Sequence, residues 1–339
     1  MTRMAFDTAT AEPATDGAAS ARGSRIALID QLRGLALVAM AIYHFTWDLE
    51  FFGYIEPGTA GTGGWKIFAR LIAGSFLFLA GYSLVLGHGT RLRLRAFLLR
   101  FAKIAAAALA ITVATYFIFP DTFIFFGILH SIAAASLVGL IFLRAPTVVL
   151  IATAIITFAA PFYLRTPFFD HPGLWWVGLS ETIPRSNDYV PLLPWFGCFL
   201  LGMAACRLWR PPVAVPGSLQ SNARWKSLLA TAGRHSLAIY LAHQPLLIGL
   251  VYAMSLVAPA ERADPVAGYR ASCISACSAE RDAAFCERFC GCTLDSLIAQ
   301  DLFADLNAGR IDVATDGRIN DISKQCTAGS AEEPEGSGQ

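Results

Sequence analysis

The sequence predicts an all-α membrane protein: a polytopic bundle of about seven transmembrane helices, followed by a small, largely helical, cysteine-rich C-terminal tail. Of its 339 residues, 55% are hydrophobic and only 15% are charged, against roughly 25% charged residues in soluble domains. The mean hydropathy is +0.52. The apolar residues fall in repeated blocks of about 18 to 23, close to the ~20 residues that cross a bilayer.

Charge is divided unevenly along the chain, although its formal total is only +1. Residues 1–257 contain 19 Lys and Arg against 11 Asp and Glu, whereas residues 258–339 contain 7 against 14. The two parts therefore meet different surroundings. The near-zero total and the absence of a phosphate-binding glycine loop motif in the sequence argue against a nucleic-acid partner.

Three regions follow from this pattern. Residues 1–24, rich in Ala, Thr, Ser and Gly, are expected to form a disordered cytoplasmic lead. Residues 25–257 form the predicted transmembrane domain, and residues 258–339 form an extracytoplasmic acidic, cysteine-rich tail. The seven apolar runs lie at about 34–54, 66–87, 99–119, 123–143, 147–164, 190–208 and 235–257.

The loops between the runs predict the orientation, because Lys and Arg are retained on the cytoplasmic side. With the N-terminus inside, fifteen basic residues face the cytoplasm, and only Lys66, Arg70, Arg165 and Arg185 face outward. An odd number of spans places the tail outside a plasma or bacterial inner membrane. If the short fifth run does not span, the tail lies on the other side.

The tail holds six of the eight cysteines, which suggests disulfides in an oxidising compartment. Two pairs have a spacing of four, so each pair shares one helical face, and a helical hairpin would link Cys273 to Cys290 and Cys277 to Cys286. A zinc site is the competing interpretation, but the tail has no His and lacks the usual C-x2-C spacing. The six tail cysteines are Cys273, Cys277, Cys286, Cys290, Cys292 and Cys326.

Several ionisable residues fall in the first run, where they are costly unless they have a partner or a water-filled cavity. Arg33, His44 and Asp48 lie on one helical stripe, with His44 about 15 Å in from the cytoplasmic end. A neutral imidazole there can accept a proton, and a carboxylate one turn away can orient it. The alternative is that His44 only bonds a neighbouring helix while Asp48 is solvated at the interface.

Two further histidines are predicted at depth, His130 in the fourth run and His243 in the seventh. By helical rise both could approach the level of His44 and line a tunnel. His130, His243 and Gln244 are the residues expected to bind the substrate there. A metal site made by the three histidines is disfavoured, because they come from three helices with no short ligand spacing. No metal is expected.

A group of basic residues precedes and enters the third run: Arg91, Arg93, Arg95, Arg100 and Lys103. One interpretation is that they set the topology and meet anionic lipid headgroups. The other is that Arg100 and Lys103, with Arg25 and Arg33, bind the phosphates of a cytosolic donor such as coenzyme A.

Three segments resemble a known family. They are Arg25-Ile-Ala-Leu-Ile-Asp30-Gln-Leu-Arg33-Gly34 continuing to Tyr43-His44-Phe-Thr-Trp47-Asp48, then Asp188-Tyr-Val-Pro-Leu-Leu-Pro-Trp195-Phe-Gly197, and Gly233-Arg234-His235-Ser236-Leu-Ala-Ile-Tyr240-Leu-Ala-His243-Gln244-Pro245. They occur in the same order in the heparan-alpha-glucosaminide N-acetyltransferase catalytic-domain family. The arginine and the histidine eleven residues later in the first run also resemble the motif of the wider integral-membrane acyltransferase superfamily.

The resemblance implies an acetyltransferase that moves an acetyl group from cytosolic acetyl-CoA to an amino sugar or sugar hydroxyl of a glycan or glycolipid. The animal members carry their catalytic histidine in the first extracytoplasmic loop, but residues 55–65 contain none. By the pattern of the wider superfamily the catalytic role falls to His44, oriented by Asp48. The donor's phosphates would be bound by Arg25, Arg33, Arg100 and Lys103. The partners expected are acetyl-CoA, a sugar acceptor and membrane lipids. A homo-oligomer is also compatible with the sequence.

Two other classes of protein fit the same pattern. A proton-coupled transporter or lipid flippase would also place His and Asp at the membrane midplane, but would move protons without releasing CoA. A non-catalytic membrane anchor that displays the tail would keep its function without His44.

Overall fold

The computed structural model describes residues 16–89, 91–182, 184–209, 224–260, 264–278, 281–311, 313 and 316–331, with side chains from residue 28 onward. Within these ranges the chain is helical and contains no strand, which confirms the all-α prediction. The chain divides into two compact units, and each is described by itself. The first comprises Met1–Phe45 and Gly63–Gly249, and the second Thr46–Thr62 and Leu250–Gln339.

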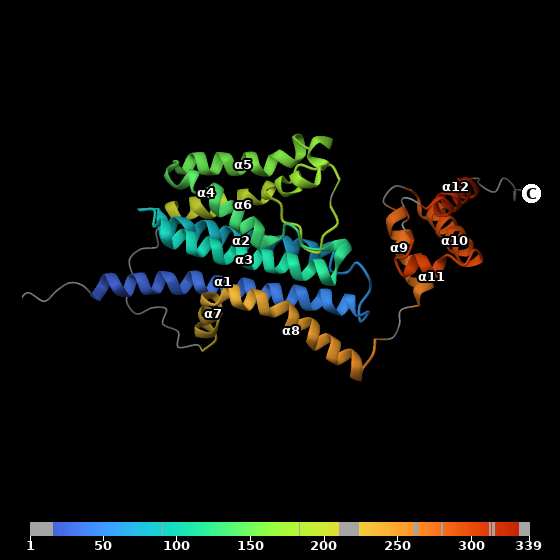
Figure 1. Ribbon diagram of the computed structural model, residues 1–339, viewed down its shortest axis with the longest axis horizontal. Helices are drawn as coiled ribbons and strands as arrows, with labels where there is room; N and C mark the ends of the chain where they lie inside the picture. The colour runs from blue at the N-terminus through green and yellow to red at the C-terminus, as the bar shows by residue number, and fades with distance from the viewer. Residues whose placement is uncertain are drawn as a thin grey trace, which may run out of the picture. The chain divides into compact units, whose positions relative to one another are not determined.

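In the part of the chain that the structure describes, eight α-helices precede the tail helices, and Figure 1 labels them in chain order. They are α1 (Asp16–Phe51), α2 (Gly63–His88), α3 (Leu94–Ile118), α4 (Ile128–Gly139), α5 (Thr147–Tyr163), α6 (Leu192–Leu208), α7 (Arg224–Arg234) and α8 (Ser236–Val257). Short 3-10 turns lie at Pro120–Thr122, Ile141–Arg144, Pro167–Asp170 and Pro172–Val177. The predicted lead, 1–24, lies outside the described residues up to residue 15 and enters α1 from residue 16.

Among the described residues, four stretches of helix are long and apolar enough to cross a membrane: Leu28–Phe51, Gly63–His88, Leu94–Ile118 and Ser236–Val257. Three further apolar helices, α4, α5 and α6, are shorter, with 12, 17 and 17 residues. At 1.5 Å per residue α4 is only about 18 Å long, against a hydrocarbon core of about 30 Å. The structure thus supports a membrane protein, and the count of seven spans is not confirmed.

The predicted run at 123–143 differs most from the structure, because only its middle is α-helical. Residues before α4 are held in an extended conformation by the loop that precedes α6. The amide of Asn187 donates to the carbonyl of Thr122, and the amide of Val190 donates to that of Phe126. These long-range bonds satisfy backbone groups that a longer helix would otherwise have used.

The core of the first unit is the packing of α6 against α2 and α5, which run side by side in Figure 1. Phe199, Leu200 and Met203 of α6 are fully buried. Two glycines permit the close approach of α2 and α6, since a Cβ on Gly81 would overlap the carbonyl of Phe199. A Cβ on Gly202 would likewise overlap the carbonyl of Phe78.

Helix α7 packs equally closely on α1. A Cβ on Gly34 would overlap the carbonyl of Leu229, and one on Gly233 would overlap the carbonyl of Asp30. This contact, with Ile29 buried against α2, fixes the basic end of α1 beside α2 and α7. The elements that carry Arg33, Ser83 and Arg234 are thereby held together.

The second unit contains the tail helices α9 (Pro265–Cys277), α10 (Ala283–Ala299), α11 (Phe303–Asn307) and α12 (Gly317–Ala331). Disulfides join Cys273 to Cys290 and Cys277 to Cys286, which confirms the predicted hairpin pairing. A third joins Cys292 to Cys326 and links α10 to α12. Leu297, Leu302 and Ile322 form a small apolar core beside this third disulfide.

Candidate active site

The described part of the first unit contains two large cavities and a much smaller one between α2, α3 and α4. The first, the basic cavity, has a volume of about 360 Å³ and is lined by Arg33, Arg100, Lys103 and Arg234 together with apolar side chains. These four cations come from α1, α3 and α7. The volume lies within the about 300 to 1,000 Å³ of ordinary ligand pockets. Four cations on an otherwise apolar wall form a site for an anionic group attached to a less polar one.

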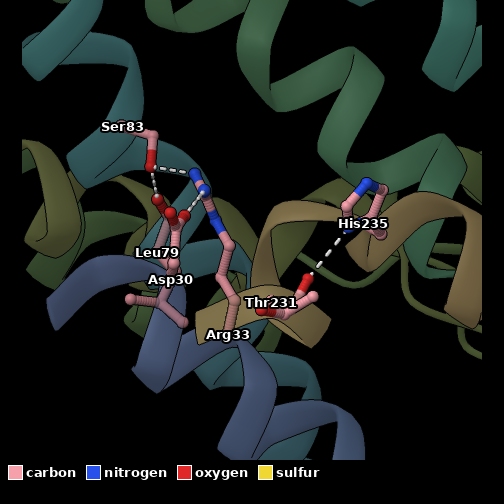
Figure 2. A network of polar contacts seen from close by, with 6 residues as sticks. All are labelled: Asp30, Arg33, Leu79, Ser83, Thr231 and His235. Atoms are coloured by element: carbon pink, nitrogen blue, oxygen red, sulfur yellow. Dashed lines mark hydrogen bonds and ion pairs between the residues drawn. The ribbon is translucent and has the colours of Figure 1, made fainter. Parts of the chain in front are cut away.

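Arg33 is held in place on both sides of its guanidinium group, as Figure 2 shows. One nitrogen donates to Asp30 at 3.1 Å, and the other donates to the hydroxyl of Ser83 at 2.6 Å. The Ser83 hydroxyl in turn donates to the carbonyl of Leu79. Asp30 is almost fully buried. Because the side chain is already oriented, Arg33 loses little rotamer entropy when it binds an anion.

The second cavity, here the histidine cavity, has a volume of about 810 Å³. His44 lines it from α1, and the polar side chains around it include Arg70, Arg165, Asn187 and Asp188. Trp195 and other aromatic side chains complete the lining of this cavity. A cavity of this size, with aromatic faces and several hydrogen-bonding groups, suits a polar small molecule.

His44 has a second histidine as its neighbour. The ring centroids of His44 and His243 are 4.9 Å apart, in an edge-to-face arrangement. Nδ1 of His243 lies 2.5 Å from the carbonyl oxygen of Tyr240 and must donate to it, because a carbonyl only accepts. Its Nε2 is therefore the bare, basic nitrogen. That atom is buried and has no hydrogen-bond partner in the part of the chain that the structure describes.

Asp188 enters the histidine cavity from the loop before α6. Its Oδ2 accepts a hydrogen bond of 2.9 Å from the amide of Ile128, the first residue of α4. It thereby satisfies one of the amides that the start of a helix leaves without an intrahelical partner. Burial raises the pKa of this carboxyl to about 6, although the Ile128 amide opposes the shift. Asp188 is thus a carboxylate that titrates near neutral pH beside His44's cavity.

The sequence of this unit decides the family. A protein-family model, described as "Heparan-alpha-glucosaminide N-acetyltransferase, catalytic", matches residues 25–245 of the chain. The chain belongs to this acetyltransferase family. No curated protein matches the chain, and no solved structure matches it.

The family match includes all residues that line the two cavities, and it ends before the tail begins. Of the predicted donor-binding residues, Arg33, Arg100 and Lys103 all line the basic cavity. The side chain of Arg25 lies outside the described residues. Acetyltransfer needs a donor pocket and a general base, and the family's matched region contains a cationic cavity and a histidine cavity next to each other.

His130 does not join the other two histidines. Its Nδ1 accepts a hydrogen bond from the amide of Gly127 at 3.2 Å. Its Nε2 lies 3.1 Å from the hydroxyl of Thr112, which itself donates to the carbonyl of Ile124. Both ring nitrogens are therefore used to fix the start of α4, and His130 lines neither cavity.

Asp48 and Gln244 were also predicted at the site. Asp48 is fully buried on α1, one turn beyond His44 in sequence, and it belongs to the second compact unit. Gln244 directly follows His243 on α8 and lines neither cavity. Among the described residues, no group of three or more His, Cys, Asp or Glu is placed to hold a metal ion.

Sequence reasoning missed several cavity residues, namely Arg70, Arg165, Asp188, Arg234 and Tyr240. Arg70 and Arg165 were seen only as outward-facing loop charges. Asp188, Arg234 and Tyr240 stand inside the three segments that resemble the family. The charge of Asp188 and of Arg234 inside those segments was the signal that would have found these two residues.

Proposed function

We propose that the protein transfers an acetyl group from cytosolic acetyl-CoA to an amino sugar or sugar hydroxyl of a glycan or glycolipid. The observation that carries the proposal is the pair of adjoining cavities in one unit, one with four cations and one with His44. This division matches the two substrates of an acetyltransferase, an anionic thioester and a neutral or polar acceptor.

The basic cavity receives the donor. Arg33, Arg100 and Lys103, with Arg234, bind the phosphates of CoA through charge-assisted hydrogen bonds. Arg33 is oriented for this task by Asp30 and Ser83. The apolar side chains that also line this cavity suit the less polar arm that ends in the thioester.

His44 is the proposed catalytic base. It removes a proton from the acceptor's N–H or O–H, the acceptor's nitrogen or oxygen bonds to the acetyl carbon, and the C–S bond breaks. The leaving thiolate takes up the proton from His44, which releases CoA and restores the base. Direct transfer and transfer through an acetyl-histidine both fit this arrangement. His243 lies beside His44 with a basic nitrogen, and Asp48 stays the proposed orienting carboxylate by its helical spacing. His130 has no part in this proposal, since both of its nitrogens are bonded elsewhere.

The proposed orientation places the N-terminus and the donor's phosphates on the cytoplasmic side and the tail outside. The bias of Lys and Arg between the loops supports it. The three disulfides of the tail support it independently, because disulfides persist in oxidising compartments.

The test is CoA release from acetyl-CoA by the purified protein in liposomes, with a panel of amino sugars supplied inside or outside. Wild type should release CoA only when a sugar is present, and His44→Ala should abolish release. The matched control is His235→Ala, because His235 is exposed and lines neither cavity. Unchanged turnover in folded His44→Ala protein would contradict the proposal, and so would proton flux without CoA release.

A further inference from the structure

The basic cavity and the histidine cavity meet at a common wall. Three residues line both: Phe76 of α2, Ile128 of α4 and Tyr240 of α8. We propose that these three side chains, the shared wall, decide whether the acetyl group is transferred to the acceptor or lost to water. This inference rests on the proposed function.

The wall stands where the reaction must cross. The four cations line only the basic cavity, and His44 lines only the histidine cavity. A thioester bound by its phosphates in the basic cavity is therefore separated from the base by the wall. The histidine cavity is large and has many polar groups, so it has room and hydrogen-bonding partners for water when the acceptor is absent.

The wall is apolar except for the Tyr240 hydroxyl, and it is held from several sides. The rings of Phe76 and Tyr240 meet edge to face, with centroids 6.4 Å apart. Ile128 is buried, and its amide is bonded by Asp188 from the histidine cavity. The carbonyl of Tyr240 accepts the hydrogen bond that fixes the tautomer of His243. The position of the wall is thus coupled to Asp188 and His243.

Without the wall, hydrolysis of the thioester would compete with acetyl transfer. Water in the histidine cavity would give a proton to His44 and attack the acetyl carbon, the C–S bond would break, and the thiolate would take up the proton. The products are acetate, CoA and a proton. An apolar barrier that opens only around the thioester and acceptor lowers the rate of this hydrolysis by excluding water.

The experiment measures CoA release from acetyl-CoA by the full-length protein in liposomes, with no acceptor present. Phe76→Ala should raise this release several-fold over wild type, and adding His44→Ala to Phe76→Ala should abolish the gain. Phe78→Ala is the matched control, because Phe78 lies two residues along α2, is also half-buried and lines neither cavity. It should leave acceptor-independent release at the wild-type rate.

Phe76→Leu gives a smaller opening and keeps the test valid if Phe76→Ala fails to fold. Equilibrium binding of acetyl-CoA to each protein is measured alongside release. Binding without any rise in release for the Phe76 variants overturns the wall but leaves the proposed function standing. Failure of wild type to bind acetyl-CoA overturns both. An equal rise for Phe78→Ala shows general loosening of the fold and also overturns the wall.

Discussion

Asp170 and Asp188 lie in the same loop region, yet their surroundings shift their pKa values in opposite directions. Hydrogen bonds from the Ser180 hydroxyl and the Thr182 amide lower the pKa of Asp170, whereas burial raises that of Asp188 to about 6. A raised carboxyl pKa stabilises the fold below the unfolded value near 3.8, and this contribution is lost as pH rises to about 6. A lowered pKa has the opposite effect. We therefore expect Asp188→Asn to gain thermal stability relative to wild type between about pH 4 and 7.

Asp170→Asn is the control. A lowered pKa acts near and below the unfolded value of 3.8, so the stability of this variant relative to wild type should be flat between about pH 5 and 7 and should rise as pH falls below about 4. Both differences are measured as melting temperatures of detergent-solubilised protein at a series of pH values. Parallel pH profiles for the two variants would contradict the opposed pKa shifts. Asn at position 188 still offers a side-chain oxygen to the Ile128 amide, so the variant removes the charge and keeps the hydrogen bond.

Single residues were predictable from sequence where one helix carries the whole pattern. Arg33 and His44 belong to α1, and their spacing alone put them on one stripe. His243 beside His44, and Arg234 beside Arg33's cavity, depend on how α7 and α8 pack. Helical spacing says nothing of contacts between helices, so the histidine pair could be suspected and the fourth cation of the basic cavity could not.

At the scale of elements, the glycine contacts between α2 and α6 make a sharp prediction. Gly81→Ala and Gly202→Ala each add a Cβ that overlaps a backbone carbonyl, so the helices must separate. We expect each to cost about 1 to 3 kcal/mol of stability, seen as a lower melting temperature. Gly87→Ala on the same helix has nothing within 4 Å of its new Cβ and should be neutral or slightly stabilising. An equal loss for all three variants would refute the close-packing argument.

Most helices were predictable from hydropathy, and the failures have a physical cause. The runs at 66–87 and 235–257 nearly coincide with α2 and α8. The run at 123–143 does not, because a loop sixty residues later bonds the backbone at Thr122 and Phe126. Local hydropathy cannot register a hydrogen bond made by a distant segment. The same bonds position Asp188 at the histidine cavity, so the failed helix prediction and the missed carboxylate share one origin.

At the scale of the whole molecule, the cysteines distinguish the tail from the membrane domain. All six tail cysteines are paired, and the two cysteines of α6, Cys198 and Cys206, are in no disulfide. The pairing of Cys273 and Cys277 with the next helix could be predicted from a spacing of four. The same three disulfides were expected only if the tail lies in an oxidising compartment. The disulfide pairing and the compartment of the tail are therefore separate predictions, and the compartment can be tested by itself.

In the variant Cys198→Ser/Cys206→Ser, every remaining cysteine lies in the tail. A membrane-impermeant maleimide applied to sealed vesicles with the extracytoplasmic face outward should label none of them, because all are disulfide-bonded. After treatment with an impermeant reductant the same reagent should label all six. Labelling that requires both reduction and permeabilised vesicles would place the tail in the cytoplasm and make the number of spans even. The four long helices and the three shorter ones, α4, α5 and α6, make seven spans if all of them cross the membrane. An even number of spans would therefore mean that one or all three of the shorter helices do not cross.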